Sequence, residues 1–171
     1  MTRTLILASE SPRRKILLQE AGYCFEIFPV NISEKLDKNL TLDQQIIAIS
    51  EQKAITAKKR LLANNRESFL ILAADTMVVL DNQALGKPVD KQQAYQFLRQ
   101  LSGREHQVKT AISFLDSKNE TLDSQLNSQT SLQTNSQTAS QTDSQAASQA
   151  KSKIVTTHVF FRQLSDAEIW D

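Results

Sequence analysis

The segment Leu5–Lys15 reads LILASESPRRK and joins an apolar run to the start of a helix. Its first part, Leu5–Ala8, is typical of a short buried strand that ends in a polar turn. Ser11 predicts the N-cap of a helix over Pro12–Ala21, because proline is favoured at the first helical position. Gly22 is the kind of residue that ends a helix. A strand followed at once by a helix indicates an α/β fold.

The same alternation continues along the chain. The residues TLDQ from Thr41 form a capping box, which predicts a long helix from Thr41 to Asn64. Its expected apolar stripe consists of Ile47, Ala54, Ile55, Leu61 and Leu62. Another helix is expected between Asp90 and Ser102. Apolar and β-branched runs predict strands over 25–30, 69–74, 77–80, 107–115 and 153–162. We therefore predict an α/β domain with a mixed sheet flanked by helices.

The composition excludes several classes of protein. Lys plus Arg (20) nearly balance Asp plus Glu (19), so no general surface for nucleic acid is expected. Cys24 is the single cysteine, so an internal disulfide is excluded. Because Cys24 lies in an apolar run, we expect its small side chain to be buried. His106 and His158 lie far apart without ligand-like neighbours, so a zinc site is not expected. No apolar run approaches the length of a membrane span, and we expect a cytoplasmic protein.

A repetitive segment separates the last two predicted strands. From Ser124 the chain reads in tetrapeptides as SQLN-SQTS-LQTN-SQTA-SQTD-SQAA-SQAK. Such a segment has too little apolar surface to offset its chain entropy. We therefore expect residues 119–152 to be a disordered insertion into a domain formed by 1–118 and 153–171. A tandem expansion within a surface hairpin accounts for it, and a Gln/Ser-rich interaction tract is the alternative.

The end of the chain begins an element that it does not complete. Ser165 and Glu168 form a second capping box, and the sequence ends at Asp171. An isolated helix needs about 12–15 residues to be even marginally stable in water. We therefore expect a domain that is incomplete at its C-terminus.

Charged residues near the predicted strand and helix ends indicate a phosphate site. The carboxylates Glu34 and Asp75 are expected at strand ends, where α/β sheets place ligands. The cations of the same set are Arg13, Arg14, Lys53 and Lys87. Carboxylates bind hard cations and Arg or Lys neutralises phosphate, which fits a triphosphate bound with a divalent metal ion. Ordinary explanations also exist, such as a solvated helix face for the two arginines or a turn cap for Asp75. The chain has no G-x-x-x-x-G-K-[ST] motif, which excludes a P-loop protein.

Six segments resemble, in order and spacing, the Maf family of nucleotide pyrophosphatases. They are LILASESPRRKILL, EQKA, AADTMVV, LGKPVD, FLRQLSGREHQVKTA and LSDAEIW. The resemblance covers residues 3–118 and 153–171. It implies an α/β fold like that of inosine triphosphatase-type enzymes, with a cleft between two lobes. The implied reaction is hydrolysis of dTTP, UTP or modified pyrimidine nucleotides to the monophosphate and pyrophosphate, a housecleaning role. The implied partner is the nucleoside triphosphate, the implied cofactor is Mg²⁺ or Mn²⁺, and a homodimer is left open.

The resemblance also implies roles for individual residues. Asp75 matches the proton acceptor that activates the attacking water, and together with Glu34 it is expected to bind the metal. Arg14, Lys53 and Lys87 match positions that contact the triphosphate.

Arg13 and Thr76 match positions tied to base choice, and Arg-Arg with Asp-Thr is the pattern of the dTTP/UTP branch. Members of the family continue beyond the EIW helix, and the Ser/Gln repeat is foreign to them. The alternative function is therefore a truncated, inactive Maf-like protein, or a module that binds nucleotides or division proteins.

Overall fold

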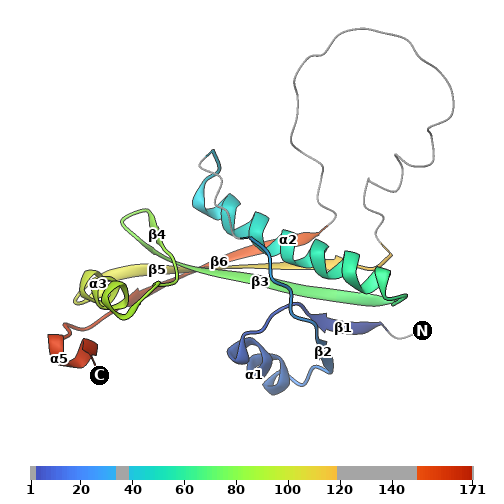
Figure 1. The fold of residues 1–171 in the computed structure, drawn as a ribbon, viewed down its shortest axis with the longest axis horizontal. Helices are drawn as coiled ribbons and strands as arrows, with labels where there is room; N and C mark the ends of the chain where they lie inside the picture. Colours follow the sequence, from blue (N-terminus) through green and yellow to red (C-terminus); the bar gives the residue numbers. More distant parts are fainter. Residues whose placement is uncertain (1–2, 34–38, 119–149, 171) are drawn as a thin grey trace, which may run out of the picture.

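The protein forms one six-stranded mixed sheet, and a computed structural model describes residues 3–33, 39–118 and 150–170 (Figure 1). The strands are β1 (Thr4–Leu7), β2 (Phe25–Ile27), β3 (Phe69–Leu80), β4 (Gln83–Leu85), β5 (Glu105–Asp116) and β6 (Lys151–Phe160). The helices are α1 (Pro12–Glu20), α2 (Leu42–Ala63), α3 (Lys91–Leu101) and α5 (Asp166–Trp170). The strand order is β2-β1-β3-β5-β6, and β4 pairs with β3. The predicted α/β class with a mixed sheet is confirmed.

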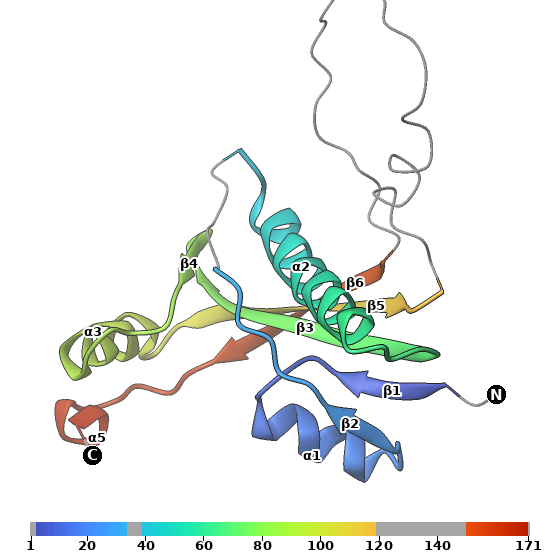
Figure 2. The ribbon, with the colours of Figure 1, turned by 45° about the vertical axis from the view of Figure 1, so that its right-hand side comes forward.

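Parallel and antiparallel pairing divide the sheet into two parts. β1 runs parallel to β2 and to β3, because α1 and α2 supply the crossover connections that parallel pairs need. β3, β5 and β6 pair antiparallel over nearly their whole length. Figure 2 shows β1, β2 and α1 at one end, and α3, β4 and α5 at the other.

The strand β3 corrects a sequence-based prediction. Asp75 and Thr76 were expected to separate a strand over 69–74 from another over 77–80, but β3 is continuous from Phe69 to Leu80. Both residues are paired with β5, Asp75 opposite Ala111 and Thr76 opposite Thr110. The pairing of a long neighbouring strand outweighs the low strand preference of aspartate.

The helix α2 covers one face of β3 and β5 (Figure 1). Its predicted capping box is present, with Thr41 and Gln44 bonded reciprocally. The predicted apolar stripe is only partly correct, because Ile46 and Ile49 are buried while Leu62 is 44% exposed. Phe69, Ile71, Ala73 and Leu115 of the sheet form a core with Ala54, Ala57 and Leu61 of the helix.

The helix α1 begins where the sequence predicted. Ser11 occupies the N-cap position without a side-chain capping bond, and Pro12 follows it. Its apolar residues Ile16 and Leu17 are 51% and 57% exposed. Cys24, expected to be buried, is also exposed. Within the described residues, α1 and β2 contain no buried residue, so apolar side chains at this end of the sheet stay exposed.

The remaining elements form the second end of the molecule. Asp81 and Asn82 have positive φ angles, 51° and 61°, which is the geometry of a tight hairpin turn between β3 and β4. The side chain of Asp90 caps α3 through the backbone N–H of Gln93 at 2.7 Å. The predicted capping box of Ser165 and Glu168 is formed at the start of α5.

The structure describes only the last residues of the expected insertion 119–152. Ala150 packs against the core, and Lys151 and Ser152 belong to β6, which therefore begins two residues before the predicted Lys153. The other residues of the insertion lie outside the described part of the chain. Within that part, no helix is long and apolar enough to cross a bilayer.

Candidate active site

The candidate site lies where β3 extends beyond the end of β1. The parallel register aligns Leu7, the last residue of β1, with Leu72 of β3. β3 then continues to Leu80, so the loop after β1 and the first turn of α1 lie beside residues 74–76. This crevice beyond the carboxyl end of a parallel strand is the place where open α/β sheets bind ligands. Asp75 therefore lies at the edge of the sheet where ligand binding was predicted. It lies inside β3, however, and not at the end of that strand.

Asp75 and Lys53 form an ion pair on the side of the sheet that α2 covers. The ammonium of Lys53 lies 2.6 Å from the Oδ1 atom of Asp75, and the two side chains are only 13% and 12% exposed. Alternation along β3 directs Asp75 toward α2, because Ala73 on the same face is buried in the core below the helix. The pair is largely shielded from water, so the electrostatic attraction between its members is stronger than at the surface.

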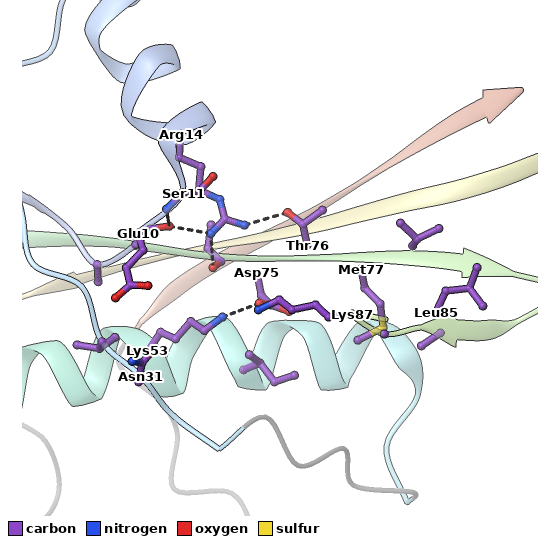
Figure 3. Close-up of a pocket in the computed structure, with 18 of the residues that line it drawn as sticks. Glu10, Ser11, Arg14, Asn31, Lys53, Asp75, Thr76, Met77, Leu85 and Lys87 are labelled. Atoms are coloured by element: carbon purple, nitrogen blue, oxygen red, sulfur yellow. Dashed lines mark hydrogen bonds and ion pairs between the residues drawn. The ribbon is translucent and has the colours of Figure 1, made fainter. Parts of the chain in front are cut away.

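The side chain of Arg14 extends from α1 to residues 74–76 of β3. Its Nη1 atom donates to the hydroxyl of Ser9 at 3.1 Å and to the carbonyl of Ala74 at 2.9 Å. Its Nη2 atom donates to the hydroxyl of Thr76 at 3.0 Å (Figure 3). Burial lowers the pKa of Arg14 from its usual value, and the charge of Asp75 acts in the opposite direction. The guanidinium stays charged, as arginine does in proteins.

These side chains line one cavity of about 690 Å³. The size lies within the range of small-molecule sites, which is about 300–1,000 Å³. Lys87 enters the cavity from the loop after β4, opposite Arg14 (Figure 3). Apolar side chains, Met77 and Leu85 among them, form part of the same wall. Positively charged, negatively charged and apolar side chains therefore line the same cavity.

Five of the six predicted site residues that the structure describes line the cavity. Asp75, Lys53, Arg14, Thr76 and Lys87 all belong to its wall, whereas the exposed Arg13 does not. Glu34 lies outside the described residues.

Sequence reasoning missed other residues of the wall. Ser9, Glu10 and Asn31 line the cavity, and the hydroxyl of Ser9 accepts hydrogen bonds from Arg14 and from the backbone of Ser11. The polar run SES was interpreted only as a turn between strand and helix. Its position directly after a buried strand was the signal that could have indicated a binding role.

The described residues offer few ligands for a metal ion. Within the described ranges, no group of three or more His, Cys, Asp or Glu side chains could hold one. Mg²⁺, however, usually keeps several waters and binds one or two carboxylates together with phosphate oxygens of the substrate. Asp75 in the cavity fits that smaller requirement.

The sequence matches one protein-family model and many curated relatives. The family model, described as "Maf-like protein", matches residues 4–171. The dTTP/UTP pyrophosphatase of Bdellovibrio bacteriovorus is 40% identical over 170 residues, which is 99% of this chain and 74% of the relative. The dTTP/UTP pyrophosphatase of Bacillus velezensis is 45% identical over 113 residues, which is 66% of this chain and 57% of the relative.

A solved structure is also similar to this chain. The HAM1 protein from Coxiella burnetii aligns with a TM-score of 0.42 and 15% sequence identity, over 68% of this chain and 65% of that protein.

Proposed function

The chain belongs to the family of Maf-like proteins, and we propose that it hydrolyses dTTP, UTP and modified pyrimidine nucleoside triphosphates to the monophosphate and pyrophosphate. The observation that carries this proposal is the shielded Lys53–Asp75 pair within a cavity that Arg14 and Lys87 also line. The choice of pyrimidine nucleotides as substrates rests on the names of the two relatives, which are both dTTP/UTP pyrophosphatases.

The reaction is the attack of water on the α-phosphorus. The new bond joins the water oxygen to that phosphorus, the bond to the bridging oxygen breaks, and pyrophosphate leaves. Asp75 accepts the proton of the attacking water, since its carboxylate lies inside the cavity. Arg14, Lys53 and Lys87 bind the triphosphate oxygens, and the two lysines neutralise the charge that moves onto the leaving pyrophosphate. Lys53 thus serves both Asp75 and the phosphate.

A divalent cation, Mg²⁺ or Mn²⁺, is part of the proposal. Asp75 and Glu34 would bind it together with the triphosphate, and the bound cation would polarise the phosphoryl oxygens. Base choice is assigned to Arg13 and Thr76. The position of Thr76 on the cavity wall supports its part in that role.

The test is the variant Asp75→Asn. The amide keeps the size and polarity of the side chain but cannot accept the proton, so pyrophosphate release from dTTP and UTP should fall by about 10²–10⁴-fold. Pyrophosphate release is measured with Mg²⁺ or Mn²⁺ present, and nucleotide binding is measured by calorimetry.

The matched control is Asp81→Asn. Asp81 is an exposed carboxylate paired with Arg104 at 2.7 Å and lies outside the cavity wall. This control should keep the parental rate. An Asp75→Asn variant that retains more than about a tenth of that rate would exclude Asp75 as the base. Binding of dTTP by the parent chain without turnover would favour a binding module over an enzyme.

A further inference from the structure

A pair of threonine hydroxyls extends the Arg14 contact into the sheet. Thr76 of β3 and Thr110 of β5 are directly opposite each other, and their hydroxyl oxygens are 3.0 Å apart. Thr76 in turn accepts from the Nη2 atom of Arg14 at 3.0 Å. Thr110 itself is not part of the cavity wall. We propose that Thr110 is a positioning residue, which acts through Thr76 to hold Arg14 in the orientation that binds the nucleotide.

The hydrogen-bonding capacity of Thr76 explains why a second partner matters. A threonine hydroxyl has one proton and two lone pairs, and Arg14 occupies one lone pair. The contact with Thr110 uses either the proton or the other lone pair. The two partners hold the hydroxyl of Thr76 in one rotamer. Thr76 is exposed, so without Thr110 its hydroxyl can turn toward water and leave the Nη2 atom of Arg14.

The orientation of Arg14 decides which of its donors face the nucleotide. Within the described residues, hydrogen bonds engage both N–H groups of Nη1 and one of Nη2. The other N–H of Nη2 and that of Nε are left for a ligand. A side chain held in its binding rotamer loses less entropy when the ligand arrives. Loss of the Thr110 hydroxyl should therefore weaken binding of the nucleotide.

The chemical step should be affected much less. Successive residues of a strand point to opposite faces, so Asp75 faces α2 while Thr76 and its neighbour Thr110 lie on the other face. The ion pair of Lys53 and Asp75 therefore lies on the face of the sheet opposite to the two threonine hydroxyls. The inference rests on the proposed function and predicts a change in KM with kcat preserved.

The variant Thr110→Val removes the hydroxyl and keeps the shape of the side chain. We expect the KM for dTTP and UTP to rise about three- to tenfold, the range of one net hydrogen bond, with kcat within twofold of the parent. Thr110→Ser keeps the hydroxyl and should restore the parental KM. Thr157→Val is the matched control, because Thr157 of β6 is exposed, lies on the same face of the sheet and is not part of the cavity wall.

A double variant tests whether Thr110 acts through Thr76. In a Thr76→Val background, Thr110→Val should cause no further rise in KM. A parental KM in Thr110→Val, a loss of kcat alone, or additive effects of the two substitutions would overturn the inference. Urea unfolding of each variant separates these effects from a loss of folding.

A failure of the proposed function is recognised separately. If the parent binds dTTP without turnover, the function fails, and a weaker dTTP affinity of Thr110→Val in calorimetry still supports the inference. If the parent neither binds nor hydrolyses dTTP or UTP, both are overturned.

Discussion

At the scale of single residues, the charged groups of the cavity are already bonded to one another. Lys53 pairs with Asp75, and Arg14 is held by Ser9, Ala74 and Thr76. A nucleotide would therefore meet side chains that are largely ordered before it binds. Such preorganisation reduces the entropy lost on binding and places catalytic groups in defined positions.

The variant Lys53→Met tests how much the central pair stabilises the fold. Without the ammonium, the carboxylate of Asp75 remains in a site where its side chain is only 12% exposed. We expect the free energy of unfolding to fall by about 2–4 kcal/mol, somewhat below the full cost of an unpaired buried charge. Urea denaturation measures the change.

Two further variants complete this experiment. The double variant Lys53→Met with Asp75→Asn removes both charges and should be more stable than Lys53→Met alone. Lys91→Met, at the exposed start of α3, should leave the urea midpoint unchanged. If Lys53→Met unfolds at the urea midpoint of the parent, water stabilises the charge of Asp75 without help from Lys53.

At the scale of elements, serine hydroxyls join α2 to β5 and β6. The buried Ser113 lies 2.5 Å from Ser50 of α2 and 2.8 Å from Ser152 of β6. Ser50 also donates to the carbonyl of Ile47, and Ser152 donates to Glu51. This polar network fixes the rotation of α2, and with it the direction in which Lys53 points.

The variant Ser113→Ala should destabilise the protein only modestly. The two neighbouring serines keep acceptors for their protons, so no buried donor is left unpaired. We expect a loss of about 1 kcal/mol, the net value of a hydrogen bond. The urea midpoint measures it, with Thr156→Ala on the exposed part of β6 as control. A loss above about 3 kcal/mol would mean that the network acts as one cooperative unit.

The helix α5 should respond to acid. Hydrogen bonds from Arg162 and Ser165 lower the pKa of Glu168 from 4.5 to about 2. A depressed carboxylate pKa means that the contact stabilises α5 above pH 4.5 and is lost as the pH falls through about 2. Trp170, the single tryptophan, stacks on Tyr95 with ring centroids 4.8 Å apart. Its fluorescence should change over this pH range.

Glu168→Gln is the matched variant for the acid response. It removes the titrating group, so its tryptophan fluorescence should already differ from the parent at neutral pH and should change little on acidification. An identical pH profile in parent and variant would exclude Glu168 as the cause.

At the scale of the whole molecule, β5 and β6 could be joined by a far shorter connection. The register pairs Phe114 with Lys151, so the two strand ends lie side by side. Replacing residues 119–149 by about four turn residues should therefore keep the sheet intact. The stability should stay the same or rise by up to about 2 kcal/mol, because a shorter loop closes at a lower entropy cost.

Urea unfolding and dTTP hydrolysis of the shortened chain test this expectation. Ala150 is retained because it packs against the core. A lower midpoint would show that the removed residues stabilise the domain, which would contradict their interpretation as a disordered insertion.

The sequence by itself determined the types of most elements and the starts of the helices, whereas it missed β4 and misplaced the ends of several strands by two or three residues. The capping boxes at Thr41 and Ser165 formed as predicted, and α3 begins directly after Asp90 as expected, because helix starts depend on bonds between residues close in the chain. It also identified Asp75, Arg14, Lys53, Thr76 and Lys87, which line the cavity. Charged residues next to apolar strands can be recognised in a sequence as candidate site residues, because burying a charge costs free energy unless the charge has a partner.

Tertiary structure alone decided how those residues are used. Pairing with β5 carries β3 through Asp75, packing on β3 and β5 sets which side of α2 is buried, and Arg14 finds its partner Thr76 across 62 positions of the chain. Each of these depends on register and packing between distant segments, and local preference carries no information about either. The same reason explains why Thr110 was not singled out, since its importance lies only in the residue that faces it.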